Sequence, residues 1–485
     1  MATYYWVGGS GTWDNTSTTN WAASSGGAGG AGPPNSADNV FFDANSGTAA
    51  TVTVASTAAC NICTFTKSDL NLSLSGNVSF TDTIDFAAGT ITLNNNKLTL
   101  VRFLSSYTAT RTVAFGTGDI TLTGNNTTIW NVASATGFAY TGTPTVNCTY
   151  SGATGTRTIS QGASGAAATE ANSVSFNITA GTDTVTFASS SFNGFKSIDF
   201  TGFAGTWSNA VITVYGNVKT STGMTIGAGA NPVIFAATSG TQQLTTNGKT
   251  WDFPIIVNAP GATVQFRDTF VMGSTRALTL QNGTLDAFNQ NVTIGSFALA
   301  SGTKTLTLGS GTWTVNAGWN SNTNVTGLTV SASTATINMI GASNKTFSGG
   351  GQTWPTVNQG GAGNLPINQN NTFANITHPV QPATIRFVVG TTQTVNAFSI
   401  SGTSGNLITL ETNIAGSRAT IYKATGSVSL SFVSIKDIAA TGGANFNAFT
   451  SNGCVNGGNN TGWDFNGALY PTIYTVRKTK RYFLN

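Results

Sequence analysis

The segment from Gly283 to Val315, GTLDAFNQNVTIGSFALASGTKTLTLGSGTWTV, restricts the possible folds more than any other part of the chain. Hydroxyl and apolar residues alternate in four short runs, and Asn-Gly, Ser-Gly or Gly-Ser pairs mark the turns. Successive residues of a strand point to opposite faces, so this period of two buries one set of side chains and exposes the other. Gly, Ser and Asn tolerate the backbone angles of tight turns. The pattern predicts short strands joined by turns, and no helix.

The low charge of the chain agrees with a thin, repetitive β structure. Only 7% of the 485 residues are charged, against about 25% in ordinary globular chains. Disorder is a poor explanation, because 39% of the residues are hydrophobic and the chain has 29 Phe and 10 Trp. Hydroxyls and amides are therefore expected to cover the surface. The net charge of +4 gives no nucleic-acid footprint, and no apolar run is long enough to span a membrane.

Two architectures fit short strands with turns of two to six residues. In a parallel β-helix, each coil of about 20–30 residues stacks on the last at about 4.8 Å. The alternative is a tandem of β-sandwiches of about 100 residues each, which the offset of 354 − 251 = 103 between Trp251 and Trp354 could support. A second internal repeat relates Gly89 to Gly283 with an offset of 283 − 89 = 194. We favour the β-helix, because sandwich strands are usually longer and the Thr and Asn content suits stacked side-chain ladders.

The two ends of the chain differ in composition from the body. Trp6, Trp13 and Trp21 lie among glycines, and large aromatics suit the cap of an exposed strand edge. Two segments are expected to be irregular. Residues 151–172 are mostly small and polar, and residues 355–383 include four prolines, which cannot donate to a strand ladder. The predicted organisation is an aromatic cap at 1–45, a body at 46–430 with irregular loops near 151–172 and 355–383, a terminal coil at 431–467, and a basic tail at 468–485.

Motifs at both ends resemble known β-helix proteins. The opening WVGGSGTW, with a further Trp eight residues on and then PNSADNVFF, resembles the start of right-handed β-helix regions in autotransporter-like adhesins and in bacteriophage structural proteins. The ending GNNTGWDF resembles the last coil of phage-encoded β-helices. The resemblance implies a virion structural protein of the fibre, spike or appendage type, built on a right-handed parallel β-helix.

Cysteine and histidine do not form a recognisable site in the sequence. Cys60 and Cys63 have the spacing of half a zinc site, but no second such pair exists, and the single histidine, His378, is more than 300 positions away. The four cysteines, which include Cys148 and Cys454, are too few for a disulfide framework at this length. We expect small buried side chains without redox or metal chemistry. His378 lacks a nearby serine nucleophile motif, so a catalytic triad is not predicted.

Carboxylates are too sparse to indicate an enzyme. Glycoside hydrolysis needs two carboxyl groups that face each other at about 5–9.5 Å, and the chain has only 16 Asp and Glu residues. For each candidate a surface role is the simpler interpretation, and for the pair near the N-terminus turn capping is simpler than calcium binding. The candidates are Asp82 with Asp85, Asp252 with Asp268, Asp38 with Asp43, and the two glutamates Glu170 and Glu411. We therefore predict no catalytic, cofactor or metal residues.

The leading expectation is a non-enzymatic component of a phage particle that is displayed outward and contributes to host attachment. The start of the chain has no basic region followed by an apolar run, so no secretion signal is predicted. Expected partners are further copies of the chain (for example as a trimer), other virion proteins and cell-surface glycans, with the tail Arg477–Arg481 as the docking segment. The alternatives are a bacterial surface adhesin or surface-layer protein and, third, a tailspike-type polysaccharide depolymerase.

Overall fold

The computed structural model describes residues 1–125, 127–164, 169–188, 194–208, 210–321, 323–342 and 345–467. The chain divides into two compact units, Met1–Met339 and Ile340–Asn485. Within the described ranges the helical segments are the short 3₁₀ turns η1 (Glu170–Asn172) and η2 (Thr450–Asn452). None of the helices described there is long and apolar enough to cross a membrane.

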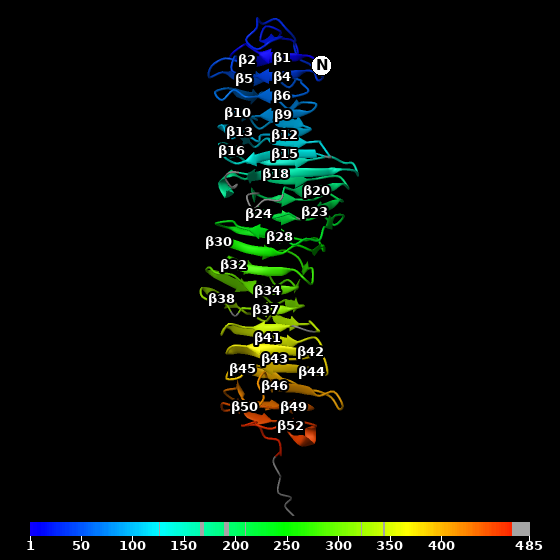
Figure 1. Ribbon diagram of the computed structural model, residues 1–485, viewed down its shortest axis with the longest axis vertical. Coiled ribbons are helices and arrows are strands. Elements are labelled where there is room, and N and C mark those ends of the chain that lie inside the picture. The colour runs from blue at the N-terminus through cyan, green and yellow to red at the C-terminus, as the bar shows by residue number, and fades with distance from the viewer. Residues whose placement is uncertain are drawn as a thin grey trace, which may run out of the picture. The chain divides into compact units, whose positions relative to one another are not determined.

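Unit 1 is a coil whose strands form a small number of flat faces (Figure 1). Its first half is three-sided: the chain passes through one strand of each face and returns to the first face after about 20 residues, as from Cys63 to Thr83. The first face contains, in spatial order, β3 (Trp21–Ala22), β1 (Thr3–Trp6), β4 (Asn39–Phe42), β6 (Cys63–Phe65), β9 (Thr83–Phe86), β12 (Arg102–Leu104), β15 (Thr127–Ser134), β18 (Thr156–Ser164), β20 (Thr184–Phe187), β23 (Thr206–Ser208) and β26 (Thr225–Ile226). The second contains β2 (Gly11–Trp13), β5 (Thr51–Val54), β7 (Asn71–Leu74), β10 (Gly89–Thr92), β13 (Arg111–Gly116) and β16 (Phe138–Gly142).

The third face of unit 1 is the longest, and a fourth set of strands accompanies it in the second half. The third face contains β8 (Val78–Ser79), β11 (Lys97–Leu100), β14 (Asp119–Leu122), β17 (Thr145–Cys148), β19 (Ser175–Ile178), β21 (Gly194–Phe195), β22 (Ile198–Asp199), β24 (Ile212–Val214), β25 (Val218–Lys219), β27 (Val233–Phe235), β28 (Thr241–Thr245), β30 (Ile255–Phe266), β32 (Ala277–Asp286), β34 (Ser296–Leu299), β35 (Lys304–Thr307), β37 (Gly318–Asn320) and β38 (Leu328–Ser331). From β21 and β22 on it divides into two ladders, β21–β24–β27 and β22–β25–β28, which join in the long strands β30 and β32 and separate again into β34–β37 and β35–β38. The fourth set is β29 (Thr250–Trp251), β31 (Phe270–Met272), β33 (Val292–Ile294), β36 (Thr312–Val315) and β39 (Thr336–Met339).

Parallel pairing in register keeps like residues in columns. Ile91 of β10 pairs with Leu72 of β7 on one side and with Val113 of β13 on the other, and all three are buried. Thr90 and Thr92, which flank Ile91, point outward, as the period of two requires. The inward columns form a continuous apolar core, and the outward columns present hydroxyls and amides to water. This explains how a chain with so little charge remains wetted.

An aromatic cap closes the N-terminal end of unit 1. β3 pairs antiparallel with β1, whereas β1 pairs parallel with β4. Trp6, Trp13 and Trp21 are fully buried, and their rings meet edge to face at 5.1 Å (Trp6 to Trp21) and 5.4 Å (Trp13 to Trp21). The cap covers the apolar end of the coil and leaves a two-residue strand at the sheet edge, which limits pairing with another chain.

Unit 2 has the same construction. One face contains β40 (Thr346–Ser348), β42 (Gly363–Asn368), β44 (Ala383–Phe387), β46 (Ile408–Thr412), β49 (Val433–Ile435) and β52 (Val455–Asn456). A second contains β41 (Thr353–Gln359), β43 (Asn371–Thr377), β45 (Thr392–Ser399), β47 (Ala419–Tyr422) and β50 (Ile438–Thr441), and the short pair β48 (Ser427–Ser429) with β51 (Asn445–Asn447) lies beside them. Its strand pairs are parallel throughout.

The structure confirms a right-handed parallel β-solenoid and not a tandem of sandwiches. The two segments expected to be irregular contain strands among their described residues. β18 crosses 151–172, and β41 to β43 with the start of β44 cross 355–383. Pro355 and Pro366 lie inside strands, where each removes one ladder donor but leaves the inward apolar columns intact. The terminal coil at 431–467 contains β49 to β52, and the tail at 468–485 lies outside the described residues.

Candidate functional site

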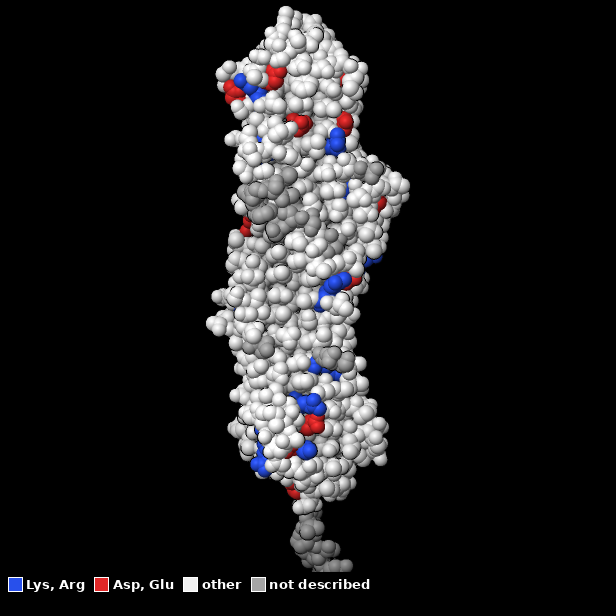
Figure 2. Space-filling view, viewed as in Figure 1, with Lys and Arg blue, Asp and Glu red and all other residues white. Residues whose placement is uncertain are grey.

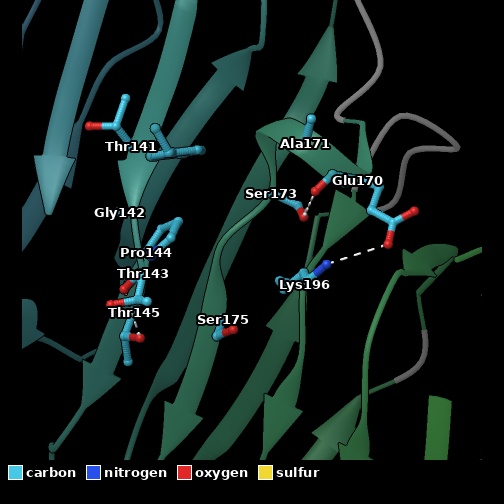
Figure 3. Close-up of a pocket in the computed structure, with 11 residues that line it drawn as sticks. Thr141, Gly142, Thr143, Pro144, Thr145, Glu170, Ala171, Ser173, Ser175 and Lys196 are labelled. Carbon is cyan, nitrogen blue, oxygen red and sulfur yellow. Dashed lines mark hydrogen bonds and ion pairs between the residues drawn. The ribbon is translucent and has the colours of Figure 1, made fainter. Parts of the chain in front are cut away.

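The first candidate is a groove of about 390 Å³ on unit 1. One wall is the connection from β16 to β17, with Thr143 and Pro144, and the other is η1 together with Lys196, which lies between β21 and β22 (Figure 3). Lys196 and Glu170 face each other across a Nζ to Oε1 distance of 3.4 Å. Ser173 Oγ donates a 2.9 Å hydrogen bond to the Glu170 backbone carbonyl oxygen on the same wall. The lining combines these polar groups with apolar surface from Tyr140, Pro144 and Ala171.

Glu170 is held as a carboxylate. Its Oε2 accepts hydrogen bonds from the backbone N–H of Thr238 at 2.9 Å and from the Thr238 hydroxyl at 2.8 Å. Burial alone would raise the pKa of Glu170, but these bonds and the Lys196 ammonium outweigh it, and the pKa lies below its ordinary value. A general acid for glycoside hydrolysis needs a raised pKa and a second carboxylate across the bond. Among the described residues that line this groove, Glu170 is the one carboxylate.

The other candidate carboxylates bind separate partners. Asp82 accepts a hydrogen bond from the Thr83 hydroxyl at 2.8 Å and lies 3.8 Å from Arg102 Nε. Asp85, three residues on, accepts instead from the Tyr107 hydroxyl at 3.0 Å. The two carboxylates therefore belong to different hydrogen-bonded pairs at and just before β9.

Asp252 and Asp268, which flank Trp251 and β30, also act locally. Asp252 Oδ1 accepts from Arg276 Nε at 2.7 Å, and Asp268 Oδ1 accepts the backbone N–H of Thr246 at 3.0 Å. In unit 2 Glu411 has a similar role, since its Oε1 accepts from Arg386 Nε on the neighbouring strand at 2.8 Å. These are cross-coil contacts at partly exposed positions.

Asp38 and Asp43 cap turns near the N-terminus. Asp38 accepts the N–H of Ala2 at 2.7 Å and that of Asn35 at 3.2 Å, and Asp43 accepts the N–H of Asn45 at 2.9 Å. Both carboxylate oxygens of Asp38 and Oδ1 of Asp43 accept backbone N–H groups, which is the usual use of Asp in turns. Among the residues that the structure describes, no group of three or more His, Cys, Asp or Glu side chains is arranged to hold a metal ion.

The cysteines are buried and free. Cys60 and Cys63 are fully buried, and desolvation raises the pKa of both thiols, with the neighbouring thiol adding for Cys60 and Asp85 adding for Cys63. Desolvation likewise raises the pKa of Cys148 to about 12 and, less strongly, the pKa of Cys454. Metals and electrophiles react with thiolates, which this environment disfavours.

His378 is nearly buried in unit 2. Its Nε2 accepts the backbone N–H of Ser401 at 3.0 Å. Burial lowers its pKa, although a backbone hydrogen bond with Val380 opposes this, so the ring is neutral at pH 7. The ring thus serves as an acceptor that joins two coils.

Fold and surface together define a parallel β-solenoid protein with polar outer grooves. On the face shown in Figure 2, charged side chains form a few small groups on a mostly uncharged surface. Comparisons with protein-family models, with curated proteins and with solved structures found no match. The class therefore rests on the strand pairing alone.

Sequence reasoning did not find the Glu170 groove. Its walls are separated by about 30 to 50 positions in the chain and meet only because the coils stack. Glu170 was singled out, but its partners Lys196 and Thr238 were not. If the coil length is known, residues that lie one coil apart in the sequence and face outward can be predicted to be neighbours, and such neighbours would indicate a groove of this kind.

Proposed function

We propose that this protein is a structural component of a bacteriophage particle, a fibre, spike or capsid-attached appendage that is displayed outward and takes part in host attachment. The observation that carries the proposal is the surface of the solenoid. Outward columns of Thr, Ser and Asn cover densely hydrogen-bonded coils, as where Thr90 pairs with Asn71 and Thr112. Such a surface is hydrated and nearly neutral, which suits a protein displayed in water.

The motifs at the two ends support the same proposal. Both are typical of β-helices in phage proteins, and the opening motif is also similar to autotransporter-like adhesins. The N-terminal motif forms the cap around Trp13 and Trp21, and the C-terminal motif includes Trp463, whose ring packs 5.2 Å from Phe446. A bacterial surface adhesin is the second candidate, because the same cap serves either class.

The test is the composition and behaviour of purified particles. Mass spectrometry of phage particles from the source strain should find the chain in stoichiometric copies, and antibodies should label it on the outside. Particles that lack it should assemble but adsorb to cells poorly. Absence from particles together with presence on the cell surface would favour the adhesin. Release of reducing sugar from host polysaccharide would favour a depolymerase.

Self-assembly is part of the proposal. Weak binding sites gain strength when several copies engage one cell together, and symmetric oligomers such as trimers provide this multivalency. The tail 468–485, outside the described residues, is the proposed docking segment to other virion proteins. Deleting residues 470–485 should release the protein from the particle while its β-sheet circular dichroism stays unchanged. A truncated chain that still joins the particle would contradict this assignment.

A further inference from the structure

An exposed phenylalanine occupies a turn that is better suited to asparagine. Phe288 is 42% exposed and has a φ of 50°, and Asn289 follows with a φ of 61°. The equivalent turn 194 residues earlier has the same backbone, with φ values of 51° and 66°, but carries Asn94 and Asn95. Asparagine adopts this left-handed region readily, whereas a bulky residue there is strained. Phe288 is therefore unfavourable in two ways: its backbone lies in a region that bulky residues avoid, and its apolar ring is exposed to water. Residues with strained backbone conformations concentrate at functional sites.

Polar side chains from the neighbouring coil hold the ring in place. The Arg267 guanidinium lies 4.4 Å from the centre of the Phe288 ring. Arg267 Nη1 donates to Gln265 Oε1 at 2.6 Å, and Gln265 Nε2 donates to Asp286 Oδ2 at 3.0 Å. Asp286 Oδ1 in turn accepts the backbone N–H of Phe288 at 2.8 Å. These contacts hold the four side chains in fixed positions, and the positive charge of Arg267 balances the negative charge of Asp286.

A second groove lies on the same outward face of β30 and β32. Its volume is about 430 Å³, and its lining includes Thr263, Thr284, Thr305 and Asn282. Asn282 is fixed by a 2.7 Å hydrogen bond from its Nδ2 to Asn258 Oδ1. An unbroken outward column of threonines runs through the groove, one from each successive coil: Thr241, Thr263, Thr284, Thr305 and Thr329.

The groove and the ring belong to one surface. Thr263 and Thr284 pair across β30 and β32, and so do Gln265 and Asp286, two residues further along each strand. Two residues of a strand span about 7 Å. The threonine hydroxyls of the groove therefore lie close to the Asp286 carboxylate, which accepts the backbone N–H of Phe288. The surface offers, in order along the strand, hydroxyls, an amide and carboxylate, and an aromatic ring.

We infer that this Phe288 platform, with the adjoining threonine groove, binds a neutral oligosaccharide. The axial C–H groups of a sugar ring pack against an aromatic face, and its hydroxyls need donors and acceptors in fixed positions, which Gln265 and Asp286 supply. An anionic ligand would meet the Asp286 carboxylate, and a cationic one would meet Arg267. The inference rests on the proposed role in host attachment and gives that role a ligand class and a place.

The site has a natural test variant. Phe288→Asn installs the residue that the equivalent turn already uses, so it should fold at least as well as the parent chain. Tyr422→Thr is the matched control, because Tyr422 is 39% exposed on unit 2 and pairs with Thr394 and Thr441, so threonine continues its column. The probe is an array of neutral oligosaccharides of three to six sugar units, followed by saturation-transfer NMR on those that bind.

We expect the parent chain and Tyr422→Thr to bind the same neutral oligosaccharides, and Phe288→Asn to bind at least about tenfold more weakly, the usual scale for loss of an aromatic contact in a site. Equal binding by Phe288→Asn would overturn the site while leaving the role in the particle intact. Binding by the parent chain only to anionic oligosaccharides, or to none, would overturn the ligand class. The proposed role in the particle is tested separately, by the protein composition of purified particles. Failure of the oligosaccharide site can therefore be distinguished from failure of the proposed function.

Discussion

The ion pair between Arg157 and Asp183 joins two consecutive coils of unit 1 inside the solenoid. Both side chains are fully buried. Arg157 Nε donates to Asp183 Oδ2 at 2.8 Å, and Nη2 donates to Oδ1 at 2.7 Å and to the Ala180 carbonyl at 2.9 Å. The guanidinium lies 5.4 Å from the centre of the Phe203 ring. Removing one partner would leave an uncompensated buried charge.

We predict that Asp183→Asn lowers the free energy of unfolding of these coils by about 3–5 kcal/mol, the usual cost of breaking a buried pair. Arg157→Met should cost as much, because it leaves Asp183 and the Ala180 carbonyl unpaired. The double change Arg157→Met with Asp183→Leu removes both charges and should cost less than either single change. Strict additivity would instead give about 6–10 kcal/mol, so the double variant tests the reasoning directly.

The measurement must be local, because a long solenoid need not unfold in one step and each coil contacts only its neighbours. Hydrogen exchange of the amides in β18 and β20 reports the stability of these coils. Gly181→Ala should destabilise the same coils, because Gly181 has a φ of 101° and a Cβ there would lie 2.7 Å from Asp183 Oδ1 and 2.8 Å from Arg157 Nη2. A cost below about 1 kcal/mol for Asp183→Asn, or an additive double variant, would refute the argument.

Three further outcomes are expected. Trp21→Ala should destabilise the N-terminal cap by about 3–5 kcal/mol and increase protease cleavage within the first coils, whereas unchanged cleavage would mean that the cap is dispensable. Burial lowers the pKa of Lys345 to about 8, so the folded chain loses this proton before the unfolded chain does. Stability should therefore rise between about pH 8 and 10.5, by at most about 3 kcal/mol, and Lys345→Met, followed by denaturant midpoints, should remove that rise. Finally, Cys60 and Cys63 should react with thiol reagents only after unfolding, and rapid reaction in the native state would contradict the raised thiol pKa values.

The period of two was sufficient to predict the fold class and much of the core. Alternation at Thr312 to Val315 correctly places Trp313 and Val315 inside β36 and the threonines outside. The same alternation explains why the Pro-rich stretch still forms strands: Val357, Leu365 and Ile367 keep the inward columns apolar around Pro355 and Pro366. A proline in a strand is tolerated here because the loss of one ladder hydrogen bond destabilises the coil less than the burial of a column of apolar side chains stabilises it.

Charged residues inside the coil were not predicted, although the alternation contains them. In RTVAF, Arg111 occupies the same inward phase as Val113 and Phe115. It is fully buried, and its nitrogens donate to the backbone carbonyls of Ser105 and Thr136, both at 2.6 Å. Composition gives no hint of this, because the acceptors are backbone carbonyls of the preceding turn and of the next coil, and they surround the guanidinium only once the coils have stacked. The Phe288 platform was not predicted either, because Arg267 reaches the Phe288 ring only once neighbouring coils have stacked.

The equal intervals between three threonines in the middle of the column also define a unit of length. Thr263, Thr284 and Thr305 are separated by 284 − 263 = 21 and 305 − 284 = 21 residues. Adding or removing one such block would move every later strand by a single rung, about 4.8 Å, without changing which side chains face inward. A one-residue insertion within a strand would instead reverse the faces of all residues up to the next corner. Mutation can therefore change the length of unit 1 in discrete steps while each remaining coil keeps its own chemistry.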